Sequence, residues 1–322
     1  MKPALLVATQ VWDPQDWVER ITPLLPDRTL LATDRKGNFT GPSDALDNVH
    51  YALVWKPRQE TLDRLKNLRA IFSLGAGVDH VFAVPRLPAV PLVRIVDSDL
   101  TARMTEYVVW QVLDHLRRGS LYRRQQRARV WRELDHPTAR ELTVGMMGLG
   151  VMGASAAEAL LRLGFVVRGW SRTPKTLAGI ETFAGPDGLG SFLSGTDILV
   201  SLLPLTPETR HFIDLKLLKT LRRTGPLGGA VLINAGRGGL QVETDIVTAL
   251  RDGTLAGASL DVFEEEPLSP ESPLWDFDSV TITPHVAAVS EARALAAQIV
   301  RQIEAFERGE PLRNRVDPRR GY

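Results

Sequence analysis

Short apolar runs alternate with stretches of helical periodicity along most of the chain. Before residue 100 the predicted strands are Ala4–Ala8, Thr29–Ala32, Tyr51–Trp55, Ala70–Leu74 and Leu92–Ile95. A second series comprises Leu142–Met147, Phe165–Trp170, Asp197–Leu203, Val231–Asn234, Ala258–Val262 and Val280–Thr283. Strands that alternate with helices are joined by crossovers and form parallel sheets. The pattern therefore predicts an α/β protein with two doubly wound parallel-sheet domains.

The pattern also indicates where one domain passes into the other. A helix around Thr101–Leu116 leads into the second series, and a helical stretch at Ser290–Glu307 is expected to return to the first domain. We therefore predict a discontinuous domain of residues 1–102 and 286–322, and a second domain of residues 103–285. A cleft is expected between them, because ligands in such sheets bind at the carboxyl ends of the strands.

The first strand of the second series ends in Gly148-Leu149-Gly150-Val151-Met152-Gly153, and a helix rich in alanine and leucine follows. Three glycines at this spacing mark an ordinary turn or, between a strand and a helix, a Rossmann dinucleotide site. Gly148 would permit the tight turn, Gly150 the approach of a pyrophosphate, and Gly153 close packing. The amides that open the helix, including those of Val151 and Met152, would face the phosphates.

The next strand runs into Ser171-Arg172-Thr173-Pro174-Lys175, and no Asp or Glu lies between Gly164 and Lys175. An NAD site usually places a carboxylate about twenty residues past the glycines, where it bonds the ribose 2′-hydroxyl. Ser171, Arg172 and Lys175 could instead bind a 2′-phosphate through charge-assisted hydrogen bonds. The alternative is a basic loop in solvent. The sequence predicts NADP(H) as cofactor in preference to NAD(H).

Composition narrows the classes of function. The 322 residues, 44% of them hydrophobic, can fill two cores, and 39 Lys+Arg against 38 Asp+Glu give no field that favours nucleic acid or membrane. The absence of cysteine excludes thiolate nucleophiles, disulfides and cysteine-bound metals, and suits a cytoplasmic location. The histidines lack metal-ligand spacing, so no metal is expected.

Three strands of the second series end in candidate catalytic residues. Val231–Asn234 leads to Arg237, Ala258–Leu260 leads to the acidic run Glu264-Glu265-Glu266, and Val280–Thr283 leads to His285. Each residue alone could be structural, but parallel strands bring all three to one edge of the sheet, beside the nucleotide site. Further cofactor contacts are expected at the same edge from Leu203, Pro204, Ala235 and Gly236.

Over nearly its whole length the sequence resembles the D-isomer-specific 2-hydroxyacid dehydrogenases, and most of all their glyoxylate/hydroxypyruvate reductase A group. The motifs that carry the resemblance are Gly148–Gly153, Trp170-Ser171-Arg172, Asn234–Gly238, Leu260–Phe263, Glu266-Pro267-Leu268, Ser272–Trp275, Thr283-Pro284-His285 and the closing Val316–Tyr322. Ala287-Ala288 depart from the wider family, which often has glycines there. The resemblance implies a flavodoxin-like substrate domain beside the Rossmann domain, and a homodimer.

The resemblance also implies a role for each candidate. His285 would protonate the carbonyl oxygen as hydride arrives from the nicotinamide. Glu266 would bond the other ring nitrogen, and Arg237 would hold the carboxylate and polarise the carbonyl of a 2-oxo acid. Asp261 would position the nicotinamide side.

In the first domain, Gly75-Ala76-Gly77 follows a strand, and the amides of Ala76 and Gly77 could form a nest for the substrate carboxylate; a plain turn is equally open. Trp55 could line the pocket or belong to the core. The arginine-rich segment Arg117–Arg132 is predicted to be a helix facing solvent or a second subunit. The resemblance implies the second subunit, so that Trp131 could reach the partner's site.

The sequence thus predicts NADPH-dependent reduction of small 2-oxo acids, glyoxylate and hydroxypyruvate. Two alternatives stay open: a D-2-hydroxyacid dehydrogenase for larger keto acids, and a nucleotide-sensing, corepressor-like binding protein. No motif reports the volume of the pocket, so the sequence leaves the physiological substrate open.

Overall fold

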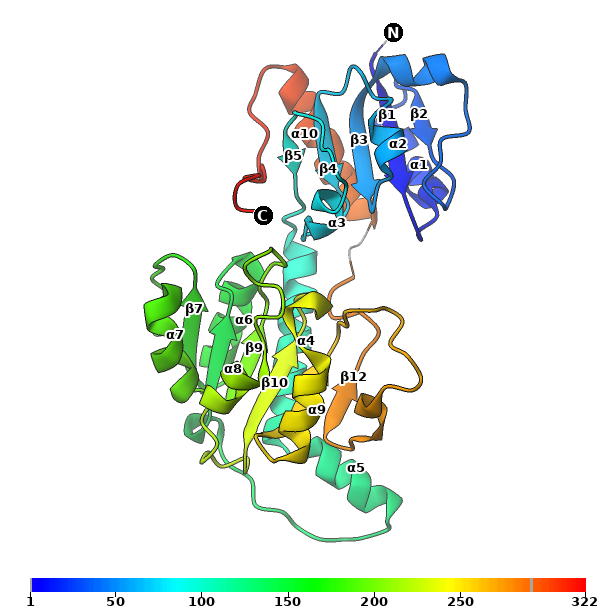
Figure 1. Ribbon diagram of the computed structural model, residues 1–322. Coiled ribbons are helices and arrows are strands. Elements are labelled where there is room, and N and C mark those ends of the chain that lie inside the picture. Colours follow the sequence, from blue (N-terminus) through cyan, green and yellow to red (C-terminus); the bar gives the residue numbers. More distant parts are fainter. Residues whose placement is uncertain (1, 290–291) are drawn as a thin grey trace. The chain divides into compact units, whose positions relative to one another are not determined.

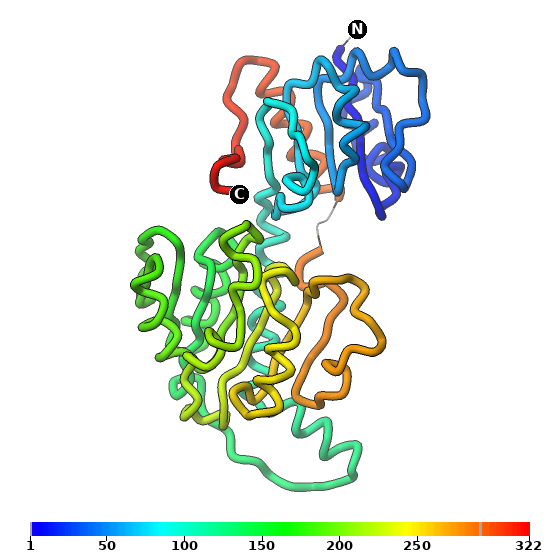
Figure 2. Tube along the Cα trace, viewed as in Figure 1, coloured from blue at the N-terminus to red at the C-terminus, as the bar shows by residue number. Residues whose placement is uncertain are grey.

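The structure is a computed structural model that describes residues 2–289 and 292–322. The chain divides into two compact units, each built on its own parallel sheet (Figure 1, Figure 2). The first unit contains the chain up to Asp99 and the C-terminal segment that ends at Tyr322, and the second contains Leu100–Val289. The predicted class of two wound α/β domains is confirmed. Ser290 and Glu291, which the predicted C-terminal helix included, lie outside the described residues.

The sheet of the first unit has five parallel strands in the flavodoxin-like order β2-β1-β3-β4-β5. Its last strand is shorter than predicted, because only Leu92 and Val93 pair with β4. On its other side this strand meets the C-terminal segment, and the Arg94 amide donates to the Asn314 carbonyl at 3.1 Å. The strands are β1 (Ala4–Thr9), β2 (Leu30–Ala32), β3 (Val49–Trp55), β4 (Ala70–Ser73) and β5 (Leu92–Val93).

Helices cover the first sheet. Asp13 caps α1 and Pro14 opens it, and the apolar side of α1 buries Trp17 and Ile21. The buried Arg28 guanidinium binds Glu307 of α10 at 2.8 Å, which ties the C-terminal helix to this unit. The helical elements are α1 (Pro14–Ile21), η1 (Thr22–Leu24), η2 (Ser43–Asn48), α2 (Gln59–Leu62), α3 (Asp79–Phe82) and α10 (Ala292–Glu307).

The sheet of the second unit has seven parallel strands in the order β12-β11-β10-β9-β6-β7-β8. Strand order therefore reverses at β6 and β9, which is where a wound sheet opens a crevice for ligand at its carboxyl ends. The edge strand β8 was not predicted, because it is short and lacks an apolar run. The strands are β6 (Thr143–Met147), β7 (Val166–Ser171), β8 (Glu181–Ala184), β9 (Ile198–Ser201), β10 (Ala230–Asn234), β11 (Leu255–Leu260) and β12 (Val280–Ile282).

Both faces of the second sheet are buried. Along β10, Val231 and Ile233 pack with α4 and α6, whereas Ala230 and Leu232 pack with the helices of the other face. This continuous apolar character is typical of strands buried on both faces. The helical elements are α4 (Ser98–Leu116), α5 (Gly119–Arg127), η3 (Ala139–Glu141), α6 (Val151–Arg162), α7 (Gly185–Ser194), α8 (Leu215–Thr220), η4 (Gly238–Leu240), α9 (Glu243–Arg251) and η5 (Pro273–Asp276).

The arginine-rich segment forms a shorter helix than predicted. Only Gly119–Arg127 is helical, none of its residues is buried, and Arg123 binds Asp114 at 2.8 Å. Trp131, beyond the end of α5, is fully exposed. In the described part of the chain, no helix combines the length and apolar character needed to cross a membrane.

Candidate active site

The three glycines between β6 and α6 have three different surroundings. Gly148 has φ +104°, a left-handed conformation that favours glycine. A Cβ at Gly153 would lie 1.9 Å from the Gly148 carbonyl oxygen, so only glycine allows the helix to pack this closely on the turn. A Cβ at Gly150 would have no neighbour within 4 Å among the described residues. These surroundings fit the three predicted roles, with the backbone left open at Gly150.

The N-terminus of α6 has the form of an anion site. Gly150 is its N-cap residue, and no side chain caps the first turn. The first amides of a helix, here those of Val151 and Met152, have no partner within the helix and point along its axis with a partial positive charge. With the open backbone at Gly150, they fit the pyrophosphate of a dinucleotide.

The residues predicted to bind the 2′-phosphate lie at the end of the adjacent strand β7 and just beyond it. Ser171 is buried at its end and donates to the Thr173 carbonyl at 2.8 Å, whereas Arg172 is exposed. The Lys175 ammonium donates to the carbonyl of Leu149 at 2.9 Å, so this cation lies against the glycine fingerprint. A phosphate attached to the ribose would meet cations here and no carboxylate from this loop.

The ends of β9 and β10 meet beside the fingerprint. The Leu202 amide donates to the Met147 carbonyl at 2.9 Å, and a Cβ at Gly236 would lie 2.9 Å from the Leu203 carbonyl oxygen. Leu203 and Ala235 are buried, and the Pro204 carbonyl accepts from Thr209 at 2.7 Å. The structure thus brings these predicted cofactor residues together at the carboxyl edge where strand order reverses.

Asn234, at the end of β10, shapes the loop that carries Arg237. Its side chain donates to the Arg237 carbonyl at 3.1 Å and accepts from the Gly236 amide at 3.1 Å. The half-buried Arg237 donates from Nη1 to the Gly236 carbonyl at 2.8 Å. A Cβ at Gly238 would lie 1.8 Å from the Phe263 carbonyl carbon, so this loop packs directly on the one that carries Glu266.

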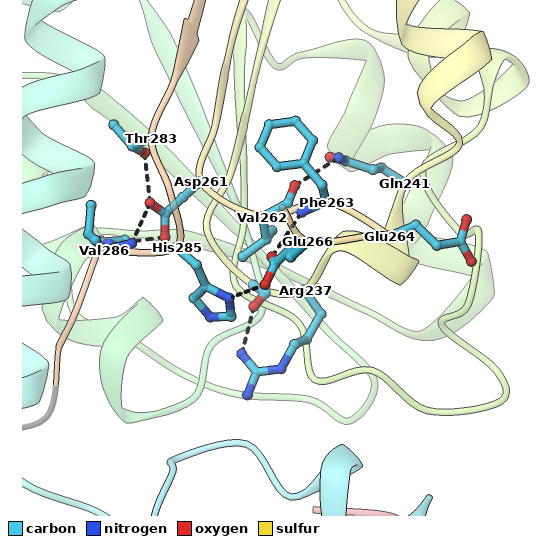
Figure 3. A network of polar contacts seen from close by, with 12 residues as sticks. Arg237, Gln241, Asp261, Val262, Phe263, Glu264, Glu266, Thr283, His285 and Val286 are labelled. Carbon is cyan, nitrogen blue, oxygen red and sulfur yellow. Dashed lines mark hydrogen bonds and ion pairs between the residues drawn. The ribbon is translucent and has the colours of Figure 1, made fainter. Parts of the chain in front are cut away.

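Figure 3 shows Arg237, Glu266 and His285 gathered at this edge, with the imidazole directed at the carboxylate. His285 Nδ1 lies 2.9 Å from Glu266 Oε2. Because a carboxylate only accepts, Nδ1 donates and Nε2 is left as the nitrogen that can exchange a proton with a ligand. The side chains are 41% and 36% exposed, so both are accessible. His285 has φ +55°, a left-handed conformation that is rare outside glycine.

Asp261 holds the loop that carries His285. Its buried carboxylate accepts from the Thr283 hydroxyl at 2.7 Å and from the amides of Val286 and Ala287 at 2.9 Å each. Burial raises the pKa of the Asp261 carboxyl, and the bonds from Thr283, Ala287 and Val286 oppose that rise. The three bonds lie on both sides of His285 in sequence, so this carboxylate fixes the path of the backbone there.

In the first unit, the predicted substrate residues form a compact group. Gly75, Ala76 and Gly77 follow β4, and a Cβ at Gly75 would lie 2.5 Å from Cζ3 of Trp55. The indole of Trp55 stacks on that of Trp12, with ring centres 4.3 Å apart and planes 9° apart. In the described part of the chain the amides of Ala76 and Gly77 have no acceptor, as the predicted nest requires.

The sequence did not predict several residues that hold the site in place. Asn234 and Thr283 act through hydrogen bonds, and Tyr107 of α4 bonds the Thr283 hydroxyl at 2.9 Å. The positions of Asn234 and Thr283, each next to a strand end, were the available signal. Trp12 and His80 contact Trp55 from distant parts of the sequence and gave none. Among the described residues, no three His, Asp or Glu side chains gather in a way that could hold a metal ion.

Comparison with known proteins extends these observations. Residues 109–287 match the family model described as D-isomer specific 2-hydroxyacid dehydrogenase, NAD binding domain. The match spans more than half of the chain and contains the glycine fingerprint, Arg237, Glu266 and His285.

Three solved structures are similar over 100% of this chain and 100% of their own. A probable 2-hydroxyacid dehydrogenase from Rhizobium etli CFN 42, in complex with NADP, HEPES and L(+)-tartaric acid, is 49% identical with a TM-score of 0.93. An NADPH-dependent glyoxylate/hydroxypyruvate reductase from Sinorhizobium meliloti, in complex with NADP and sulfate, is 46% identical with a TM-score of 0.92. A D-isomer specific 2-hydroxyacid dehydrogenase from Xanthobacter autotrophicus Py2, in complex with NADPH and MES, is 43% identical with a TM-score of 0.93.

Proposed function

The chain belongs to the D-isomer specific 2-hydroxyacid dehydrogenase family, and we propose that it reduces small 2-oxo acids, glyoxylate and hydroxypyruvate, to 2-hydroxy acids. The cofactor is NADP(H), used in preference to NAD(H). The observation that carries the proposal is the His285–Glu266 pair, with 2.9 Å between Nδ1 and Oε2, at the sheet edge that also bears the fingerprint and Arg237.

The chemistry follows from these side chains. NADPH, when bound, supplies the hydride that is added to the carbonyl carbon. His285 donates the Nε2 proton to the carbonyl oxygen, while Glu266 accepts from Nδ1 and keeps the ring in this orientation. Arg237 binds the substrate with its planar donor fork and stabilises negative charge on the oxygen. Asp261 acts on the reaction through the loop that it holds.

The basic loop after β7 accounts for the choice of cofactor. We assign the 2′-phosphate to Ser171, Arg172 and Lys175, and the pyrophosphate to the turn at Gly148–Gly153. Arg172 is exposed just past the end of β7, and Lys175 lies against the fingerprint. Leu203, Pro204, Ala235 and Gly236 would contact the rest of the dinucleotide.

We further propose that the two domains predicted from the sequence have separate roles in binding. Residues 103–285 would bind the dinucleotide, and residues 1–102 with 286–322 would bind the acid through Gly75–Gly77 and Trp55. The unused amides of Ala76 and Gly77 support a role in binding the carboxylate.

A homodimer in the cytoplasm completes the proposal. The fully exposed Trp131 and the half-exposed Val130 are an unusual pair for a surface that faces only water. Light scattering of the purified protein tests for the homodimer independently of activity.

The experiment that tests the function is a panel of 2-oxo acids with NADPH, run on the wild type, His285→Ala and His211→Ala. His211 is a matched control, because its Nε2 pairs with Glu264 at 3.1 Å in the same unit. Loss of the proton donor should lower turnover by roughly 10²–10⁴-fold in His285→Ala, with NADPH affinity unchanged. His211→Ala should retain wild-type turnover. Wild-type turnover in His285→Ala would require another proton donor.

A further inference from the structure

His80, in α3 of the first unit, is buried and makes hydrogen bonds with both ring nitrogens. Nδ1 accepts from the Lys56 amide at 3.0 Å, and Nε2 lies 3.0 Å from the Ser73 hydroxyl. Because a backbone N–H can only donate, Nδ1 carries no proton, and the ring proton of the neutral imidazole is on Nε2. The imidazole therefore donates to the Ser73 hydroxyl.

Ser73 passes this constraint to the loop that follows β4. Since its oxygen accepts from His80, its own proton is directed at the carbonyls of Gly75 and Gly77, which lie at 3.0 and 3.4 Å. The Gly75 amide also donates to the same oxygen, at 3.2 Å. One hydroxyl thus holds the peptides that join Leu74 to Gly75, Gly75 to Ala76 and Gly77 to Val78. The Ala76 amide, proposed to receive the carboxylate, shares its peptide with the bonded Gly75 carbonyl, so its direction is set directly. The Gly77 amide lies in the single peptide between two that Ser73 holds.

The ring of His80 also contacts Trp55. The ring centres are 4.2 Å apart with planes inclined by 44°, and Trp12 stacks on Trp55 at 4.3 Å. The six-membered ring of Trp55 in turn lies against Gly75, where no Cβ could be accommodated. A single imidazole therefore restrains both the indole and the loop.

We propose that His80 is a positioning residue for the 2-oxo acid, which holds the Gly75–Gly77 loop through Ser73 and the Trp55 ring through direct contact. The inference rests on the proposed function, since it gives this loop the substrate carboxylate. It assigns His80 an effect on binding of the acid, with no part in proton transfer and none in binding NADPH.

Two amide variants separate the two nitrogens of His80. Glutamine in His80→Gln reaches the position of Nε2 and can still donate to Ser73, whereas asparagine in His80→Asn reaches only that of Nδ1. Loss of one hydrogen bond to the loop should raise the KM for glyoxylate about tenfold in His80→Asn. The value of kcat should stay within about threefold, because the proton donor is untouched. His80→Gln should restore most of the affinity.

Ser73→Ala and His50→Asn complete the experiment. Ser73→Ala should raise the KM for glyoxylate as His80→Asn does, and the double variant should be no worse than either one. His50, in β3 of the same unit, has a buried Nδ1 without a hydrogen-bond partner among the described residues, so His50→Asn should leave the KM unchanged. All assays use the full chain, with the KM for NADPH and the melting temperature measured alongside.

The outcomes distinguish the two proposals. A wild type that reduces no 2-oxo acid rejects the proposed function. An active wild type whose His80→Asn variant keeps its KM for glyoxylate, or loses only thermal stability, rejects the role of His80 alone. A rise in KM that His80→Gln does not reverse also rejects it, because the donor to Ser73 would then be irrelevant.

Discussion

Replacement of Gly150 by alanine isolates the nucleotide contact from the stability of the fold. The backbone at Gly150 has φ −71°, which alanine adopts freely, and its Cβ would meet no described atom within 4 Å. The free energy of unfolding should therefore change by less than about 1 kcal/mol. The new methyl group would occupy the space through which the pyrophosphate approaches. Loss of one amide–phosphate bond costs about 1.5–3 kcal/mol, which weakens NADPH binding by roughly tenfold to over a hundredfold.

Gly153→Ala is the matched contrast three residues further on. Its Cβ would lie 1.9 Å from the Gly148 carbonyl oxygen, whereas carbon and oxygen normally stay about 3.3 Å apart. The turn or the helix must therefore shift by more than an ångström, and overpacking of this kind costs about 1–3 kcal/mol or more. This variant should lose thermal stability, and its weaker NADPH binding should accompany that loss.

The assay is titration of NADPH by fluorescence, with thermal unfolding of the same samples. In the absence of NADPH, Gly150→Ala and the wild type should have the same melting temperature. Added NADPH should raise the melting temperature of Gly150→Ala by less than that of the wild type. If Gly150→Ala bound NADPH with wild-type affinity, the open backbone at Gly150 would not be a phosphate site. If instead Gly150→Ala melted far below the wild type, its surroundings would not be open.

Two other predictions follow from named contacts. Arg172→Ala should weaken the binding of NADPH by about tenfold or more, through loss of a charge-assisted bond of about 1.5–3 kcal/mol, and leave the binding of NADH almost unchanged. Steady-state kinetics with both cofactors checks this, and equal losses of affinity for the two would contradict it. Burial lowers the pKa of His115 from 6.5 to about 4, and its Nε2 lies 2.9 Å from the Ser259 hydroxyl. As pH falls from 6.5 toward 4 the unfolded ring takes up a proton that the folded ring refuses, so stability decreases, by up to about 3 kcal/mol. Chemical denaturation at pH 6.5 and at pH 4 should show that His115→Gln loses less unfolding free energy over this range than the wild type. An equal loss would show that the buried ring of His115 is not the cause.

The sequence predicted those parts of the fold that local patterns determine. The buried strands of both sheets are apolar runs in the sequence, and the glycine fingerprint lies between a strand and a helix, as predicted. The edge strand β8 has no such run, since Glu181–Ala184 is only partly buried and is defined by its pairing with β7. The strand β5 ends at Val93, two residues before the predicted end, because its length is set by pairing with β4 and not by a local pattern.

Part of the candidate site could likewise be predicted from the sequence, and part depends on contacts that only the folded chain makes. Arg237, Glu266 and His285 follow strands, so the topology of a parallel sheet suffices to bring them together. Asp261 was expected to position the nicotinamide side, and its bonds to Thr283, Val286 and Ala287 depend on a turn that no sequence pattern specifies. Likewise, nothing in the sequence connects Trp12, Trp55 and His80, whose contacts exist only in the folded unit.

We expect the enzyme to recognise a carboxylate beside the carbonyl that it reduces. Glyoxylate and glycolaldehyde are of similar size and differ in that group, so their kcat/KM values with NADPH measure this recognition directly. Glyoxylate should be favoured by at least about a hundredfold, since charge-assisted bonds to Arg237 and to the loop amides each contribute about 1.5–3 kcal/mol. Arg237→Lys should erase most of that preference, because lysine lacks the planar fork. Equal kcat/KM values for the two substrates in the wild type would show that the enzyme does not recognise the carboxylate.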